Sequence, residues 1–222
     1  MQLSNSSLSV FVECARCFYF DRVLKQPRPR GIFSSLPGGI DGLLKERYAT
    51  QRGTLPEILK RPELEGYELF KNTALLSKYQ NWRGNPLNYN DGKGNILAGA
   101  LDELLYNPKK KLYVPADFKT RGSKPDQAYC EKYYQKQIDI YTFMLEKAGL
   151  KTAGFGVLIY FWPVACEESE IKFESDTFIM DTSVDRAQKL FNEAIECVSK
   201  KGLPEASASC EYCAMVNTRG KA

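Results

Sequence analysis

Two Cys-x-x-Cys pairs lie near opposite ends of this 222-residue chain, Cys14 with Cys17 and Cys210 with Cys213. Four thiolates gathered at one point form a tetrahedral site for Zn²⁺ or hold an iron–sulfur cluster. Compact zinc ribbons space their two pairs about 15–20 residues apart. A shared site in this chain would instead require the fold to bring its two ends together. We therefore expect residues 1–25 and 203–222 to be joined by a four-cysteine metal site.

The cysteine count itself argues against a disulfide framework. The chain has seven cysteines, an odd number, and its first residues carry no basic segment of the kind that opens a secretory signal. The alternative reading of the four paired cysteines is that they are buried free thiols. That reading is the weaker one, because Cys210 and Cys213 lie in a polar segment with little core to join. Cys130, Cys166 and Cys197 are expected to be ordinary small apolar residues.

The chain contains no histidine. Histidine is the commonest general base near neutral pH and the commonest metal ligand. Its absence excludes Ser-His-Asp triads, Cys-His pairs and HExxH zinc sites. Any chemistry must use carboxylates, lysine, cysteine or a metal ion held by oxygen or sulfur.

The hydrophobic pattern predicts an α/β protein in which helices cover a mixed sheet. The proline-rich segment 26–31 is expected to be a basic extended loop, and the polar stretch 83–95 a series of turns. By default a chain of this length forms one domain. Helices are expected over 9–24, 40–52, 129–148 and 183–200, and strands over 96–106, 112–119, 154–162 and 170–179.

An acidic and an amine side chain share one face of an expected strand. Asp117 and Lys119 are two residues apart, so they point to the same side while Phe118 points to the other. Asp102 lies on the preceding strand of the same hairpin. Clustered carboxylates repel unless a cation lies between them, and oxygen ligands suit Mg²⁺ or Mn²⁺. The alternative is a surface ion pair between Asp117 and Lys119, which would contribute about 0–1 kcal/mol.

These residues form a larger pattern with the helix that follows. Gly99-x-x-Asp102, then Asp117-Phe-Lys119, then Gln137 and Tyr141 one helical turn apart closely resemble the PD-(D/E)XK nuclease superfamily, most strongly its RecB-like branch. The resemblance implies a restriction-endonuclease-like core. It also implies metal binding by Asp102, Asp117 and the Phe118 carbonyl, an attacking water assisted by Lys119, and contact with the site and with DNA by Gln137 and Tyr141. The alternative to these implied roles is that Tyr141 packs in the core and Gln137 is solvated.

Members of that superfamily usually carry a further His or Glu ligand on an earlier helix. In this chain Gly39-Ile-Asp41 places an aspartate there, a departure from the pattern that an oxygen-ligated cation would tolerate. Asp41 is thus a candidate fourth metal ligand, with Glu46 in reserve. The alternative is that Asp41 is a helix N-cap or first-turn acid.

The cysteines resemble a narrower group, the iron–sulfur RecB-like nucleases, which include exonucleases of CRISPR adaptation and helicase-nucleases of the AddB type. In that group one early cysteine joins three late ones around a [4Fe–4S] cluster. Here the split is two and two, so Cys17 would supply the fourth ligand. The resemblance implies a [4Fe–4S] cluster, with Zn²⁺ as the alternative.

Basic residues in the loops are candidates for contact with a nucleic-acid backbone. The net charge of +4 permits a polyanionic partner without requiring one. Each of these residues has the alternative of being an ordinary solvated charge. The candidates expected around the acidic site are Arg28, Arg30, Arg121 and Lys124, with Lys109, Lys110 and Lys111 in the hairpin turn.

The expected function is that of a single-domain, metal-dependent DNA nuclease over residues 1–222, an exonuclease on single-stranded DNA or DNA ends. Partner proteins of DNA repair, phage replication or CRISPR adaptation are all compatible with the resemblance. One alternative is a nucleic-acid-binding or assembly subunit of the same fold with weak or no catalysis, and another is a metal-stapled protein-interaction module. The longest apolar run, 155–162, is too short to span a membrane, so a cytoplasmic location is expected.

Overall fold

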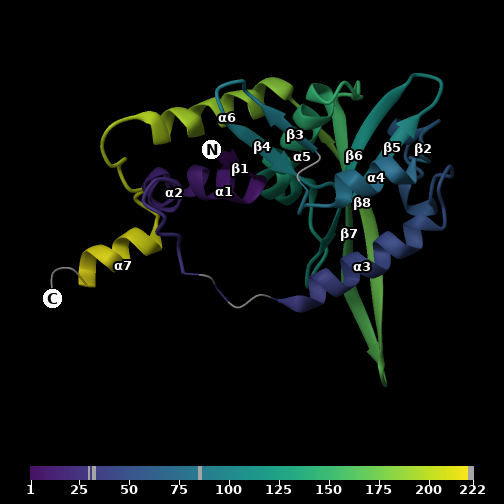
Figure 1. Cartoon of the computed structure of the whole chain (residues 1–222). Helices are drawn as coiled ribbons and strands as arrows, with labels where there is room; N and C mark the ends of the chain where they lie inside the picture. Colours follow the sequence, from purple (N-terminus) through teal and green to yellow (C-terminus); the bar gives the residue numbers. More distant parts are fainter. Residues whose placement is uncertain (30, 32–33, 85–86, 220–222) are drawn as a thin grey trace.

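A computed structural model of the chain describes residues 1–29, 31, 34–84 and 87–219 (Figure 1). The helices are α1 (Asn5–Glu13), α2 (Ala15–Arg22), α3 (Ser35–Ala49), α4 (Thr73–Gln80), α5 (Gln127–Lys147), α6 (Val184–Ser199) and α7 (Glu211–Arg219), with 3-10 turns η1 (Glu57–Leu59) and η2 (Pro62–Leu64). The strands are β1 (Gln2–Leu3), β2 (Glu68–Leu69), β3 (Leu87–Asn90), β4 (Ile96–Gly99), β5 (Glu103–Asn107), β6 (Leu112–Thr120), β7 (Phe155–Glu167) and β8 (Glu170–Asp181).

The strands form two mixed sheets. The main sheet has the order β2-β5-β6-β7-β8, and the smaller one has the order β1-β4-β3. In the main sheet β5 and β6 form the expected antiparallel hairpin, whereas β6 and β7 are parallel. A parallel pair needs a crossover connection, and α5 lies within that connection. The chain is therefore an α/β protein with mixed sheets flanked by helices, as the sequence predicts.

Different helices cover the two faces of the main sheet. On one face Phe118 packs against Tyr48 of α3, with ring centroids 4.9 Å apart. On the other face α5 contributes a continuous buried run from Ile138 to Leu145. Because side chains alternate along β6, Asp117 and Lys119 point to the α5 face while Phe118 points to α3.

The N-terminal helix differs from the expectation of a single helix over 9–24. The chain leaves helical geometry at Cys14, where φ is −162° and ψ is 108°. The Cys14 N–H still donates to Val10 O at the end of α1, and its carbonyl accepts from the Phe18 N–H at the start of α2. One residue therefore ends one helix and begins the next, a break that apolar periodicity does not register.

Two further boundaries differ from the sequence prediction. Helix α3 begins at Ser35 rather than at residue 40, so it includes Gly38 and Gly39, which cost helix stability without preventing a helix. The expected strand 96–106 is two strands in different sheets, β4 and β5. The three residues between them, 100–102, lie outside both ladders, and the last of them is Asp102. In addition, β3 forms within the stretch expected to hold only turns and pairs with β4.

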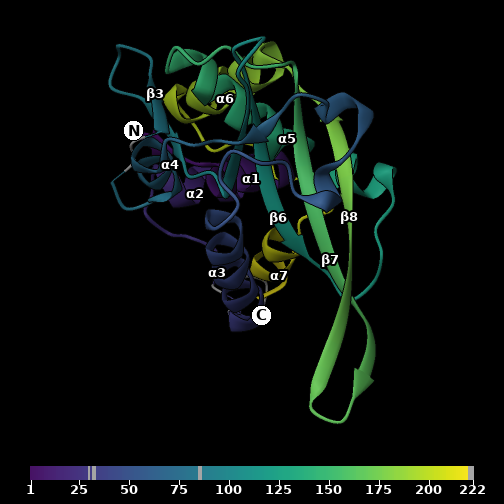
Figure 2. The same cartoon turned by 90° about the vertical axis from the view of Figure 1, so that its right-hand side faces the viewer.

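The β7–β8 hairpin is longer than predicted and projects beyond the rest of the sheet (Figure 2). We expected Pro163 to end the first strand, because proline cannot donate a ladder hydrogen bond. The pairing instead shifts register between Pro163 and Ala165 and continues to Glu167. The bulge accommodates the proline, and the side chains beyond it are exposed.

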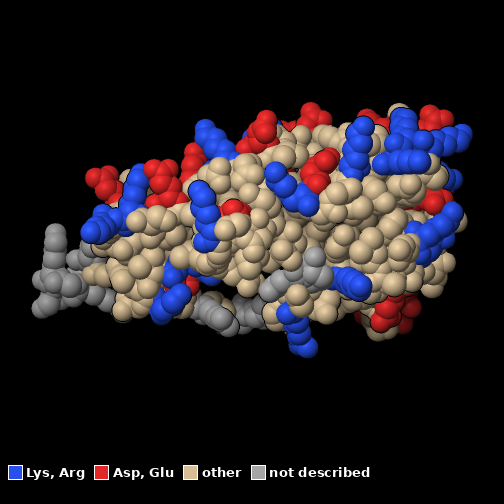
Figure 3. All heavy atoms as spheres, turned by 45° about the horizontal axis from the view of Figure 1, so that its top comes forward, with Lys and Arg blue, Asp and Glu red and all other residues tan. Residues whose placement is uncertain are grey.

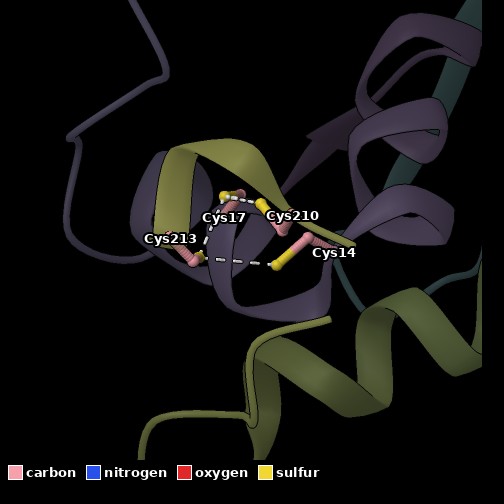
Figure 4. Close-up of side chains that lie close together, drawn as sticks. All are labelled: Cys14, Cys17, Cys210 and Cys213. Atoms are coloured by element: carbon pink, nitrogen blue, oxygen red, sulfur yellow. Dashed lines mark hydrogen bonds between the residues drawn. The ribbon is translucent and has the colours of Figure 1, made fainter. Parts of the chain in front are cut away.

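Helix α2 and the start of the C-terminal helix α7 lie together at the end of the molecule opposite the main sheet (Figures 1 and 4). Helices α1 and α2 both pack against α6, which leads into the C-terminal segment. In the described residues no helix is both long and apolar enough to cross a membrane.

Candidate active site and candidate metal centre

The acidic site forms where the β5–β6 hairpin begins and ends. Asp102 directly precedes β5, and Glu103 pairs with Ala116, so Asp102 lies opposite Asp117. The Asp102 Oδ2 atom accepts a hydrogen bond from the Phe118 N–H at 3.1 Å. The N–H and C=O groups of one strand residue point to the same edge, which directs the Phe118 carbonyl to the side of Asp102.

Asp117 and Lys119 form a buried ion pair between Oδ2 and Nζ. Asp117 is only 1% exposed. Its burial raises its pKa to about 7; Lys119 opposes this shift, and the nearby Asp102 carboxylate adds to it. Burial alone would lower the pKa of Lys119, but the attraction of Asp117 outweighs it, so that pKa is raised. Lys119 is therefore a cation at neutral pH and acts as a hydrogen-bond donor.

Gln137 and Tyr141 of α5 both point at Asp117. Gln137 Nε2 donates to Asp117 Oδ1 at 2.8 Å and to the Tyr141 hydroxyl oxygen at 2.6 Å. The Tyr141 O–H in turn donates to Asp117 Oδ1 at 3.3 Å. Tyr141 is buried, so its contacts hold Asp117 in place rather than reaching a surface where DNA could bind.

Gly99, the first residue of the Gly-x-x-Asp motif, lies against the side chains of Met144 and Tyr141 on α5. A Cβ atom at Gly99 would lie 2.8 Å from Met144 Cε and 3.8 Å from Tyr141 Cε1. A larger residue at this position would displace the end of the Met144 side chain. The first residue of the Gly-x-x-Asp motif thus has a packing role beside the acids.

Asp41 joins the same site from the opposite face of the sheet, through a lysine. Lys45 Nζ lies 2.7 Å from Asp41 Oδ2 and 2.8 Å from Asp102 Oδ1. Because α3 begins at Ser35, Asp41 lies beyond its first turn, which rules out the N-cap alternative. Glu46, the reserve candidate, is exposed.

A cavity of about 330 Å³ opens beside these groups. Asp117 does not border it, although its ion-pair partner Lys119 does. The donors that face the cavity are carboxylate oxygens, the chemistry that Mg²⁺ or Mn²⁺ prefers. The lining residues are Pro37, Gly38, Asp41, Leu44, Asp102, Phe118, Lys119 and Thr120.

Sequence reasoning missed the residues that hold Asp102 and α3 in place. Arg52, just after α3, forms an ion pair with the fully buried Glu103, with 2.5 Å between Nη1 and Oε1. Gln80 Nε2 donates to the Asp102 backbone carbonyl at 2.7 Å. Arg52 and Gln80 are far from Asp102 in sequence and carry no motif. Lys45 could have been found, because it lies four residues after Asp41 on one helical face.

The four paired cysteines form a second, separate site (Figure 4). All four are buried, and their sulfur atoms lie within 4.8 Å of one another. The sulfurs of Cys14 and Cys213 are 3.7 Å apart. Cys17 Sγ is 3.5 Å from that of Cys210 and 3.6 Å from that of Cys213. The fold thus brings the two ends of the chain together at a four-thiol site, as the sequence predicts.

This thiol set could bind a metal ion such as Zn²⁺ or an iron–sulfur cluster. Zinc–sulfur bonds of about 2.3 Å in a tetrahedron place the sulfurs about 3.8 Å apart, close to the three contact separations of 3.5, 3.6 and 3.7 Å. A cluster puts several iron and sulfide atoms between its thiolates and requires wider spacing. Burial alone would raise the pKa of Cys14, but the Ser207 N–H and the neighbouring thiols lower it to about 6, so Cys14 is a thiolate at neutral pH.

Arg28 belongs to the cysteine site and not to the acidic one, which corrects the sequence expectation. Its Nη2 lies 3.6 Å from Cys210 Sγ, and its Nη1 lies 2.5 Å from Glu13 Oε2. The guanidinium also stacks over the Tyr212 ring at 4.7 Å. These contacts hold the Arg28 side chain at the cysteine site, away from the aspartates of the acidic site. Arg30 lies outside the described residues.

The other basic candidates divide between the two ends of β6. Arg121 and Lys124 follow Lys119 closely; Arg121 stacks on Tyr129 at 4.0 Å, and Lys124 lies 3.3 Å from Asp176. The expectation that Lys109, Lys110 and Lys111 border the acidic site is wrong. Their turn lies at the other end of β6, roughly 20 Å away at about 3.3 Å per residue. On the face in Figure 3, basic side chains gather toward the sheet end with acidic ones among them.

Comparison with known proteins identified no relative of this chain. A scan of the sequence against protein-family models found no match, and a search of the curated proteins found no relative. We therefore infer the function from the geometry of the site itself.

Proposed function

We propose that the chain is a metal-dependent DNA nuclease with a restriction-endonuclease-like core of the RecB-like PD-(D/E)XK type. One observation carries the proposal: Asp102 and the Lys119 ammonium border a cavity with oxygen donors, and Asp117 lies directly against Lys119 on the neighbouring segment of the same hairpin. Gln137 and Tyr141, the remaining elements of the resemblance, both contact Asp117. The substrate we propose is single-stranded DNA or DNA ends.

In this mechanism Asp102, Asp117 and the Phe118 carbonyl, with Asp41, would hold one or two Mg²⁺ or Mn²⁺ ions. Such an ion polarises a phosphate and lowers the pKa of a bound water. Gln137 and Tyr141 fix the orientation of Asp117 through its Oδ1 atom. Lys119 has a raised pKa, so it orients the attacking water by donating hydrogen bonds rather than by removing a proton.

The test is cleavage of end-labelled single- and double-stranded DNA with Mn²⁺. Wild type should shorten the labelled strand, whereas Lys119→Met and Asp117→Asn should each lose at least about a hundredfold in rate. Lys189→Met is a matched control, because Lys189 forms an exposed i,i+4 pair with Glu193 on α6. Equal rates in all four proteins would overturn the proposal.

For the cysteine site we propose a single Zn²⁺ ion, in place of the [4Fe–4S] cluster that the resemblance implies. The support is the sulfur–sulfur spacing, which suits one tetrahedral ion. Protein purified without oxygen should be colourless and carry about one zinc per chain. A brown sample with four irons per chain would restore the cluster.

A second candidate function is nucleic-acid binding without efficient catalysis. The specific observation is that Asp41 replaces the usual ligand and is already paired with Lys45. This candidate predicts DNA binding that persists when divalent ions are removed, with no shortening of either substrate. The nuclease proposal predicts Mn²⁺-dependent cleavage under the same conditions.

A further inference from the structure

Lys45 contacts carboxylates from two separate elements, and none of the motifs includes it. Its ammonium lies 2.7 Å from Asp41 on its own helix and 2.8 Å from Asp102 beside the sheet. These are distances of direct charge-assisted hydrogen bonds. One side chain thus joins α3 to the start of β5 at the edge of the cavity.

The ammonium lies where a bridging cation would have to bind. A divalent ion held by the same two oxygen atoms would be about 2.0–2.2 Å from each. Such an ion and the Lys45 Nζ atom would then share one pair of ligands within a few ångströms of each other. Two cations at that separation repel strongly in a partly buried site, so one must leave when the other binds.

The charge balance leads to the same conclusion. With Asp117 ionised, as metal binding requires, Asp41, Asp102 and Asp117 supply three negative charges, and Lys45 with Lys119 supplies two positive ones. A divalent ion added to this set would reverse its sign, whereas an ion that replaces one lysine would keep it close to neutral. The acids are therefore compensated before any metal arrives.

Of the two lysines, Lys45 is the one free to move. Lys119 is paired with the buried Asp117, and its ammonium lies 5.0 Å from the centre of the Tyr134 ring. Lys45 is more exposed, at 27% of its side chain, and lies beside an open cavity. Its flexible four-carbon stem can move the ammonium aside without moving α3.

We propose that Lys45 is a resident counter-ion of the acidic site, which holds Asp41 and Asp102 together and is displaced when a divalent cation binds. This inference rests on the proposed metal site and adds a residue that sets its occupancy. Lys45 acts through the acids, so it is a positioning residue. It makes the site fold without metal at the cost of weaker metal affinity.

The test is Mn²⁺ binding to the full-length protein, measured by the loss of the free-ion paramagnetic resonance signal. Lys45→Met keeps the length of the side chain and removes its charge, and it should bind Mn²⁺ about tenfold more tightly than wild type. Lys45→Arg keeps the charge and should stay within about threefold of wild type. Lys189→Met, which removes the exposed lysine of an i,i+4 pair on α6, should leave the affinity unchanged.

Thermal unfolding provides a second readout. Without added divalent ions Lys45→Met should unfold below wild type, because Asp41 and Asp102 then repel. Saturating Mn²⁺ should shrink or reverse that difference. Affinity that is equal or weaker in Lys45→Met, or no Mn²⁺ binding by either protein, would overturn the inference. Tight Mn²⁺ binding without DNA cleavage would instead overturn the nuclease and leave Lys45 in this role.

Discussion

The acidic site and the cysteine site each gather groups that repel one another when charged, but the chain compensates them differently. At the acidic site, lysine ammoniums contact all three aspartates. At the cysteine site, the one cation in contact among the described residues is Arg28, which it shares with Glu13. The acidic site therefore carries its counter-charges within the fold, whereas four thiolates would need a metal ion.

The two sites also differ in what surrounds them. Asp41 lies on the α3 side of the main sheet and Asp117 on the α5 side, and each side has a large apolar cluster. The four cysteines form a small cluster of their own, with only Val10 and Ala206 packed against it among the described residues. Few apolar contacts stabilise the joined ends, so their cohesion depends on what the thiolates bind.

The largest expected effect is therefore loss of the cysteine-bound metal. Structural zinc contributes about 10–16 kcal/mol in small zinc domains, and here we expect several kcal/mol. Cys17→Ser, or a strong zinc chelator added to wild type, should release the metal and expose residues 203–219 to proteolysis. Thermal unfolding, metal content and limited proteolysis measure the three consequences together.

The control for that change is Cys166→Ser, since Cys166 is exposed and lies on the projecting hairpin. It should retain full metal content and wild-type stability. If Cys17→Ser kept its metal and its resistance to protease, the cysteine site would be a cluster of packed thiols.

The next effect concerns the buried pair that anchors α3 beside the acids. Arg52→Ala leaves the Glu103 carboxylate buried without its partner, and broken buried pairs cost about 3–5 kcal/mol. Burial already raises the pKa of Glu103, and Arg52 opposes that shift, so the variant should regain stability as the pH falls and Glu103 takes up a proton. Urea unfolding at pH 5 and pH 8 measures this loss.

Arg52→Ala also tests whether the acidic site and the cysteine site are independent of each other. Because Arg52 lies beside the main sheet, its loss should leave the metal content of the cysteine site unchanged. A parallel loss of metal would show that the two sites are coupled through the fold. A loss of under about 1 kcal/mol would place the Arg52–Glu103 pair among ordinary surface ion pairs.

The sequence was most informative where a short motif and a strand coincide. The alternation of side chains along β6 was enough to place Asp117 and Lys119 on one face of that strand. Helical spacing was enough to place Gln137 and Tyr141 on one face of α5. Neither pattern could give the break between β4 and β5. That break depends on which sheet each strand joins, a tertiary choice that local apolar alternation does not record.

The counter-ions were harder to predict, because charge pairing is set by three-dimensional proximity. Lys45 and Arg52 are ordinary helix-face cations by sequence, and Arg28 was expected at the acids because its loop is basic. The loop instead runs past the cysteines, where Glu13 and Tyr212 engage the guanidinium. For the cysteines, ligand number and spacing in sequence predict a shared site but leave its occupant open.

A smaller effect is the pH dependence that Asp117 gives the acidic site. Its pKa rises from an ordinary 3.8 to about 7 in the folded protein. Between these values the unfolded chain releases this proton while the folded chain keeps it, so this group lowers stability as the pH rises from about 4 to 7. Asp117→Asn cannot release a proton, and its stability relative to wild type should increase over that range.

Urea unfolding of both proteins at half-unit pH steps, in buffer free of Mg²⁺ and Mn²⁺, gives that difference directly. The groups facing Asp117 are Lys119, Asp102, Gln137 and Tyr141, and all remain in the variant. Added Mn²⁺ should reverse the trend in wild type alone, because metal binding requires the ionised carboxylate. A difference that is flat from pH 4 to pH 7 would contradict the raised pKa.

The smallest effect, and the most direct contrast between the sites, comes from Arg28. Arg28→Met keeps an apolar stem but removes the charge beside Cys210, and loss of a partner outside the ligand set typically weakens metal binding 10–100-fold. We expect about tenfold weaker zinc binding, measured by competition with a chromophoric chelator, and a smaller loss in Arg28→Lys, which lacks the planar fork. Removal of a cation should thus weaken metal binding at the thiolates, whereas removal of Lys45 should strengthen it at the acids. Arg28 would support the bound zinc, whereas Lys45 would compete with the divalent ion, so their removal must change metal affinity in opposite directions. Effects of the same sign at both sites would mean that the two cations act through general charge.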